Sequence, residues 1–228
     1  AEAQTMFANQ NMLDTAGVGV PTTFDELLSS GKKLKSGDIS GVAMRSKADG
    51  TAGSWPGGGF VFSNGGVIIQ DGVCMLDSPE AIEAIHYYGT ILREAGPLGV
   101  GNYHWYECLN DYMQEVCAIG MDSSNFATDI ENPEKSNAAG HTTYGAMVSG
   151  PGKTAKPNMW HWMSGINSKS QNKAAAFLFL TWANSKPTCL MSSALGLATT
   201  RTSAWESEGF KSAFGAQAAT AALTNLQN

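Results

Sequence analysis

The sequence predicts an α/β fold, because stretches with the apolar spacing of helices alternate with short stretches typical of strands. Hydrophobic residues make up 43% of the 228 residues, which is enough to form a buried core. Helices are predicted over 77–96, where Pro79 lies in the first turn and Gly96 follows the last, and over 105–116. A strand is predicted over 117–122, where larger apolar residues alternate with small or polar ones.

The first part of the chain is predicted to contain two helices and a strand. Residues 5–17 are predicted to be helical and to end at Gly17, a residue type that commonly terminates helices. Thr23 and Glu26 form a capping box ahead of the second helix. A short strand is predicted over 39–45.

The glycine-rich stretch 53–66 is predicted to be a loop that presents Trp55 to a ligand. A core tryptophan is expected on a strand or helix, where neighbouring side chains hold it. Glycines around the ring would let the backbone and a ligand approach each other closely. The overlapping stretch 60–72 is predicted to be either a helix end or a hairpin.

The second half of the chain continues the alternation of helices and strands. A strand is predicted over 142–148, and the loop at 150–158 is the best candidate for a boundary. A strong helix is predicted over 170–186, with Trp182 on an apolar face that is expected to lie in the core. The alanine-rich tail 203–228 is predicted to be weakly helical.

Composition excludes several classes of function. The net charge is −6 and the chain has no basic patch, so nucleic acid is not an expected partner. No apolar run approaches the ~18 residues of a membrane span. The four cysteines show no metal-ligand spacing, so neither a metal nor a cofactor is expected; buried thiols or a Cys108–Cys117 disulfide are both open.

Tryptophans and short polar residues are the candidate binding groups. Each loop tryptophan could be a half-buried surface ring, but together the rings suggest flat apolar walls for the C–H faces of a sugar. Polar residues follow the strand at 117–122, where ligands bind open α/β sheets, although capping of the next helix would also explain them. The aromatic candidates are Trp55, Trp105, Trp160 and Trp162, and the polar ones are Asp122, Ser123, Ser124 and Asn125.

Catalytic signals are weak. The sequence has no G-x-S-x-G, H-E-x-x-H or Walker A motif. Glu107 and Asp122 are the best candidates for the paired carboxylates of a glycoside hydrolase. Glu107 also falls at a helix start, where a carboxylate stabilises the helix dipole.

Motifs in a specific order resemble a known family over nearly the whole chain. The order is "MLDTAGVGVPTTFDELL", "SGVAMR", "LDSPEAIEAIHYYGTILREAGPLGVGNYHWYECLNDYM", "AIGMDSSNFATDIENPEKS", "GINSKSQNKAAAFLFLTWANSK" and "LATTRTS". It resembles the extracellular solute-binding proteins, family 1, of bacterial ABC importers for sugars. The resemblance implies a periplasmic-binding-protein type II-like fold with two lobes and a hinge.

The resemblance also implies an incomplete pair of lobes. Residues 1–163 would form a largely complete C-terminal-type lobe. Residues 164–228 would form part of the N-terminal-type lobe after the hinge crossing, and the first part of that lobe would be missing.

The resemblance further implies roles for individual residues. Trp55 and Trp105 match positions of aromatic residues, and Asp122–Asn125 match a loop that contacts ligand. Asn125 stands where some members have a stacking tryptophan. The remaining candidates are Glu107 among the ligand-binding residues, Trp160 next to the hinge, and Arg201 at a turn near the cleft.

The expected function is therefore substrate capture for an ABC importer, without catalysis. The expected partners are a sugar, oligosaccharide or polyol and a membrane permease, and the complete protein is expected to be a monomer. The expected location is periplasmic or extracellular, with a lipid anchor on the full-length protein as an option. The alternatives are a glycoside hydrolase-like enzyme that uses Glu107 and Asp122, and an interaction module without a small ligand.

Overall fold

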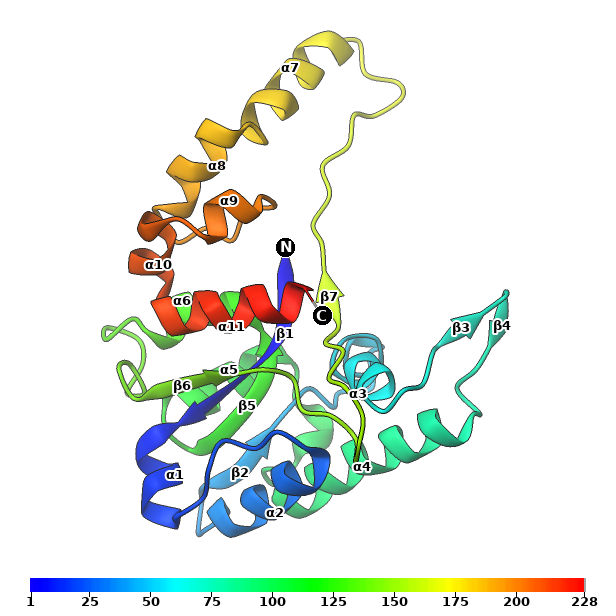
Figure 1. Ribbon diagram of the computed structural model, residues 1–228, viewed down its shortest axis with the longest axis vertical. Helices are drawn as coiled ribbons and strands as arrows, with labels where there is room; N and C mark the ends of the chain where they lie inside the picture. Colours follow the sequence, from blue (N-terminus) through cyan, green and yellow to red (C-terminus); the bar gives the residue numbers. More distant parts are fainter. Residues whose placement is uncertain (228) are drawn as a thin grey trace.

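A single central strand organises the fold. The computed structural model describes residues 1–227, and its main sheet has the order β2-β5-β1-β6, with β7 paired to the start of β1 (Figure 1). Strand β1 is antiparallel to β5, β6 and β7, while β2 is parallel to β5. These strands are β1 (Glu2–Asn9), β2 (Ser40–Ala43), β5 (Cys117–Ser123), β6 (Thr142–Gly145) and β7 (Met159–Trp160).

Helices cover the sheet, which confirms the predicted α/β class. In Figure 1, α2 and α4 lie below the sheet and α11 crosses above it near β1. The helices of the first part are α1 (Gln10–Ala16), α2 (Phe24–Leu34), α3 (Gly58–Ser63), α4 (Pro79–Ala95), α5 (Trp105–Met113) and α6 (Ala127–Ile130), with short turns η1 (Gly53–Gly57), η2 (Val100–Asn102) and η3 (Ser124–Phe126). The predicted helices at 77–96 and 105–116 and the predicted strands at 117–122 and 142–148 are all present, with shorter bounds at several ends.

The predicted helix over 5–17 is wrong for its first half. Residues 2–9 form β1, and only residues 10–16 are helical, ending at Gly17 in the left-handed conformation. All of β1 after Glu2 is buried, because other strands pair with both of its edges and helices cover its faces. A strand that is buried on both faces does not alternate polar and apolar residues. The alternation that would have predicted a strand was therefore missing from residues 2–9.

Helix α2 and strand β2 follow the prediction closely. The Thr23 hydroxyl accepts from the Glu26 N–H at 3.2 Å, and the Glu26 carboxylate accepts from the Thr23 N–H at 3.3 Å. A Cβ on Gly41 would lie 1.8 Å from the Gly31 carbonyl oxygen, so glycine allows α2 to pack directly on β2.

Most of the stretch 53–66 is helical, over residues 53–63, and is not the predicted loop. Residues 53–57 form a π-helical turn that runs into α3. Both predictions for 60–72 apply in part, because α3 ends at Ser63 and the hairpin of β3 (Ile69–Gln70) and β4 (Val73–Cys74) follows. The hairpin projects away from the sheet (Figure 1).

Two helices form an arm that stands away from the sheet: α7 (Lys173–Ala183) and α8 (Lys186–Ser193) (Figure 1). The predicted helix is present, but Trp182 is not in the core, since 57% of its side chain is exposed. No residue of α7 is buried against the described part of the chain.

The tail returns to the sheet after the arm. It forms α9 (Thr202–Trp205), α10 (Glu208–Phe214) and α11 (Ala216–Gln227). Trp205, Phe210 and Phe214 share a buried cluster with Phe7 of β1 and Tyr112 of α5. The lobe boundary at residue 163 stays a prediction, but residues 202–227 lie in the same core as residues 1–163, so the segment standing apart is shorter than 164–228.

Among the described residues there is neither a disulfide nor a helix suited to crossing a membrane. All four cysteines are free, with Cys108 and Cys117 buried beside each other and Cys74 exposed on the hairpin. Over residues 1–227 no helix combines the length and the apolar character needed to cross a membrane.

Candidate functional site

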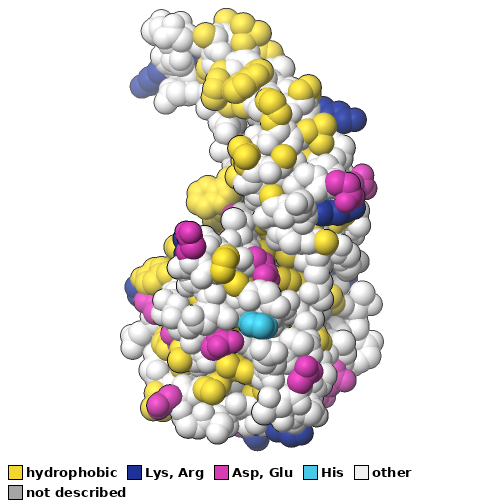
Figure 2. Space-filling model, turned by 90° about the vertical axis from the view of Figure 1, so that its left-hand side faces the viewer, with side chains coloured by type: hydrophobic (Ala, Val, Ile, Leu, Met, Phe, Trp, Pro, Cys, Tyr) yellow, Lys and Arg dark blue, Asp and Glu magenta, His cyan; other side chains and the backbone are white. Residues whose placement is uncertain are grey.

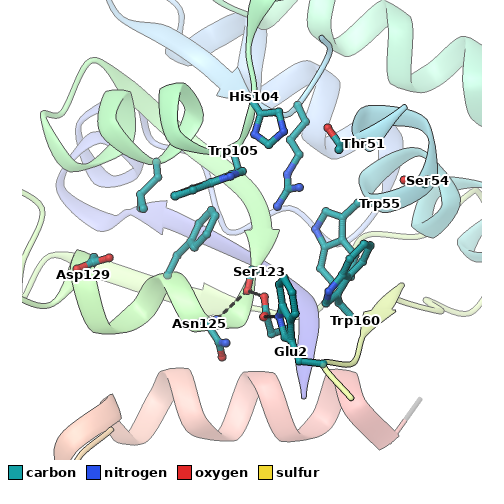
Figure 3. A pocket seen from close by; sticks show the side chains of 14 residues that line it. Glu2, Thr51, Ser54, Trp55, His104, Trp105, Ser123, Asn125, Asp129 and Trp160 are labelled. Carbon is teal, nitrogen blue, oxygen red and sulfur yellow. Dashed lines mark hydrogen bonds between the residues drawn. The ribbon is translucent and has the colours of Figure 1, made fainter. Parts of the chain in front are cut away.

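One edge of the sheet carries a cavity of about 520 Å³ (Figure 3). Because β1 and β5 are antiparallel, the start of β1 and the end of β5 meet at this edge. Side chains from six regions close around it: the start of β1, the residues after β2, the η1 turn, the start of α5, the β5–η3 segment and the β7 segment. The lining residues are Glu2, Arg45, Thr51, Ser54, Trp55, His104, Trp105, Leu109, Ser123, Asn125, Phe126, Asp129, Trp160 and Trp162.

Aromatic rings form two walls of the cavity. On one wall, Trp160 packs edge-on to Trp55 with ring centres 5.7 Å apart, and Trp162 continues this wall. On the other, Trp105 packs against Phe126 at 5.9 Å. Figure 3 shows Trp55 and Trp160 on one side of the cavity and Trp105 on the opposite side. Trp105, Trp160 and Trp162 keep large parts of their rings exposed, so these faces are available for stacking.

Trp55 plays a different part from the one the sequence predicted. Only 2% of its side chain is exposed, and it lies in a helical turn instead of a mobile loop. The neighbouring glycines serve packing: a Cβ on Gly59 would lie 1.8 Å from Gln4 Oε1 of β1, and one on Gly58 would lie 2.9 Å from Asn158 Nδ2. These contacts hold Trp55 in place next to Trp160, where it forms part of the cavity wall.

A buried ion pair lies behind the cavity. Arg45 Nε and Nη2 donate to the two carboxylate oxygens of Asp122, each at 2.6 Å. Burial raises the pKa of the Asp122 carboxyl, while the Arg45 guanidinium and the Ser123 N–H act in the opposite direction. Asp122 does not line the cavity, but Arg45 does. The sequence prediction missed Arg45, although its place directly after a strand was a usable signal.

Glu2 gathers polar groups at the mouth of the cavity. Trp162 Nε1 donates to Glu2 Oε1 at 2.8 Å, and the Ser123 hydroxyl donates to Glu2 Oε2 (Figure 3). Asn125 N donates to the same Ser123 hydroxyl at 3.1 Å. Ser123 therefore caps the η3 turn and also faces the cavity, so the capping and site interpretations both apply to it. Glu2 was missed because no strand was predicted over residues 2–9, so nothing in the sequence placed it beside Ser123.

Three cavity residues carry buried polar atoms without a hydrogen-bond partner in the described structure: Trp55 Nε1, His104 Nδ1 and Asn125 Oδ1. The Trp55 indole nitrogen lies near Asp122 without reaching hydrogen-bond geometry. Buried polar atoms are nearly always hydrogen-bonded in proteins, so several unpaired ones around one cavity indicate that a polar ligand can occupy it.

Four predicted residues do not line this cavity: Glu107, Asp122, Ser124 and Arg201. The Glu107 carboxylate accepts from the His104 N–H at 2.8 Å and caps α5, which matches its interpretation as a helix-start residue. Arg201 Nε donates to the Asn184 carbonyl oxygen at 2.7 Å, next to the arm. Of the predicted binding residues, the structure brings together Trp55, Trp105, Ser123, Asn125 and Trp160, with Asp122 held behind Arg45.

Comparison with known proteins gives a family. The profile of the family described as bacterial extracellular solute-binding protein matches residues 1–188. Among curated proteins, the erythritol/L-threitol-binding protein of Mycolicibacterium smegmatis is 28% identical over 116 residues, which are 51% of this chain and 24% of that protein.

Two solved structures share the fold. A solute-binding protein of an ABC transporter from Agrobacterium radiobacter K84, in complex with ribitol, is 24% identical, with a TM-score of 0.88 over 100% of this chain and 58% of that one. One from Agrobacterium vitis S4 with bound D-mannitol is 19% identical, with a TM-score of 0.80 over 99% of this chain and 56% of that one. The chain thus spans less than two thirds of the length of these relatives.

Proposed function

The chain belongs to the bacterial extracellular solute-binding proteins, and we propose that it is the ligand-holding part of a component that captures a sugar or polyol for an ABC importer. One similar protein is named for binding erythritol and L-threitol, and two others were solved with ribitol and with D-mannitol bound. All of these are small polyhydroxy compounds. Handing the ligand to a membrane permease, location outside the cytoplasmic membrane, a lipid anchor and a monomeric state belong to the same proposal.

The cavity itself is the observation that carries the proposal. It combines exposed faces of Trp105 and Trp160 with unpaired polar atoms such as Asn125 Oδ1. A polyhydroxy ligand needs both, because its C–H groups pack on aromatic faces while its hydroxyls donate and accept hydrogen bonds. Binding proteins of this kind close two lobes on the ligand, and we propose that residues 1–163 supply one of these lobes.

The site favours binding over catalysis. Glu107 is engaged in a helix cap and Asp122 in an ion pair, and neither lines the cavity. The two carboxylates that do line it are engaged as well: Glu2 accepts from Trp162 and Ser123, and Asp129 pairs with Lys135 at 2.6 Å. A glycoside hydrolase would need two carboxylates facing the scissile bond from opposite sides. We therefore propose that the ligand leaves the protein unchanged.

The test is a calorimetric titration of the protein with ribitol, mannitol, erythritol and maltose. We expect saturable binding of at least one of them, and a loss of about tenfold or more in affinity for Trp160→Ala. Trp182→Ala is the matched control, because it removes an exposed tryptophan from the arm; its affinity should stay unchanged. Absence of binding by every compound, or equal losses for both variants, would contradict the proposal.

A further inference from the structure

Arg45 faces the cavity in a fixed orientation. Its Nε and Nη2 groups are held by Asp122, and within residues 1–227 no acceptor is found for its remaining N–H groups. The guanidinium carbon lies 5.9 Å from the centre of the Trp55 ring, and the Tyr88 hydroxyl donates to the Arg45 carbonyl oxygen. The N–H groups of Arg45 that Asp122 does not hold are therefore free to donate to a ligand in the cavity. The side chain is already ordered before the ligand arrives.

The donors and acceptors of the cavity are separated. Arg45 supplies donors near the end of β2, beside the η1 turn. The Glu2 carboxylate and Asn125 Oδ1 supply acceptors at the start of β1 and in η3. A hydroxyl group can accept from the first set and donate to the second, whereas a carboxylate or phosphate oxygen can only accept.

The charges around the cavity act against an anionic ligand. Glu2 and Asp129 line it, and Arg45 is its one arginine or lysine among the lining residues. Asp122, with 1% of its side chain exposed, already neutralises that arginine. His104 is paired with Asp49 at 3.5 Å, which adds a further carboxylate nearby. Asp129 is paired with Lys135 at 2.6 Å, whereas Glu2 makes no ion pair within residues 1–227, so a negatively charged ligand would meet the uncompensated carboxylate of Glu2.

We propose that Arg45 binds two neighbouring hydroxyl oxygens of the ligand, and that the Arg45–Asp122 pair makes the site selective for uncharged polyhydroxy compounds over their acids. Asp122 acts as a positioning residue, because it orients the guanidinium and cancels its charge without touching the ligand. A planar guanidinium matches two adjacent acceptors, which an ammonium group does not. This inference rests on the proposed function and names the chemical class of ligand.

The experiment compares ribitol with ribonate, the acid that carries a carboxylate at one end of the same chain. Affinities are measured by calorimetry for the unmodified protein and for three variants whose folding is checked by thermal unfolding. We expect ribitol to bind at least about tenfold more tightly than ribonate. Arg45→Lys keeps the charge and should weaken ribitol binding about tenfold to a hundredfold. Arg93→Lys, at an exposed position on α4, should change it less than about twofold.

Asp122→Asn separates positioning from a purely structural role. It leaves Arg45 with an uncancelled charge, so ribonate should gain relative to ribitol even while both affinities fall. A structural defect alone would lower both affinities equally and leave their ratio unchanged. An unchanged ratio, equal binding of ribitol and ribonate by the unmodified protein, or full affinity in Arg45→Lys would overturn the inference. If no polyol or sugar binds to the unmodified protein, the proposed function fails instead.

Discussion

Helix α7 is more apolar in sequence than helix α11, yet α11 is packed on the sheet and α7 stands away from it. Helix α11 buries Ala218, Ala219 and Ala222 against β1 and β6. Helix α7 has more large apolar residues, yet Phe177, Leu178, Phe179 and Trp182 are all more than half exposed. Figure 2 shows hydrophobic side chains gathered over the arm. The amino-acid pattern of a helix therefore indicates that it has an apolar face, while the surrounding chain decides whether that face is covered.

We call the sheet and the helices packed on it the body, in contrast to the arm. The two regions should differ most in how much stability is lost when a tryptophan is removed. Trp205 is 3% exposed, packs on Phe210 with ring centres 4.8 Å apart, and donates from Nε1 to the Thr199 carbonyl oxygen at 2.8 Å. We expect Trp205→Ala to lower the free energy of unfolding by about 3–5 kcal/mol, because it leaves a large cavity. Urea unfolding followed by circular dichroism measures this. A loss below about 1 kcal/mol would show that the tail does not belong to the core.

Thiol labelling should rank the same regions by local stability. We expect iodoacetamide at pH 8 to modify Cys74 first, since it is exposed. Cys189 in α8 is buried but belongs to the arm, so it should follow through local opening. Cys108 and Cys117 should react last, because both are buried and burial raises the pKa of each thiol, to about 12 for Cys117. Mass spectrometry of timed samples gives the order, and equal rates for Cys189 and Cys117 would argue that the arm is as stable as the body.

These two regions also show what the sequence could predict. Local signals were sufficient for α2, whose capping box is present, and for α4 and β5, whose apolar spacing is clear. They failed for β1, because burial on both faces removes the polar–apolar alternation, and for Trp182, because no part of the described chain covers it.

The site was predicted in part for the same reason. Trp105, Trp160, Ser123 and Asn125 were found because loop tryptophans and polar residues after a strand are local features. Arg45 and Glu2 reach the cavity only through the pairing of β1 with β5 and of β2 with β5, which is a long-range property. Trp55 was predicted to be a site residue because glycines surround it. In the structure two of these glycines allow close packing against Gln4 and Asn158, which is a different reason.

The two regions also differ in how their helices are capped, with the better cap in the better packed region. Helix α2 has a reciprocal cap that includes Glu26, whereas Asn172 at the start of α7 makes no side-chain capping bond. Hydrogen bonds from Thr22 hold the pKa of Glu26 below its ordinary value of 4.5. Its stabilisation is therefore present above that value and is lost as pH falls through the lowered folded-state pKa.

Glu26→Gln consequently should be slightly less stable than the unmodified protein at pH 7, and the difference should shrink as the pH falls below 4.5. Parallel thermal unfolding at several pH values measures it. A difference that grows on acidification would contradict the cap geometry.

Trp182→Ala should have the smallest effect on stability of the changes considered, although it deletes the same side chain as Trp205→Ala. Its side chain is 57% exposed and its ring lies 5.8 Å from that of Phe179 between centres, so we expect a change below about 1 kcal/mol in the 228-residue chain. Dye binding to exposed apolar surface should fall as well. A loss as large as that of Trp205→Ala would mean that the arm is packed.

The most direct test of the account is a crystal structure of the protein grown with ribitol. We predict electron density between Trp105 and Trp160, with two neighbouring hydroxyl oxygens about 3 Å from the free edge of the Arg45 guanidinium. Ligand bound elsewhere, or in the cavity with its hydroxyls turned away from Arg45, would contradict it.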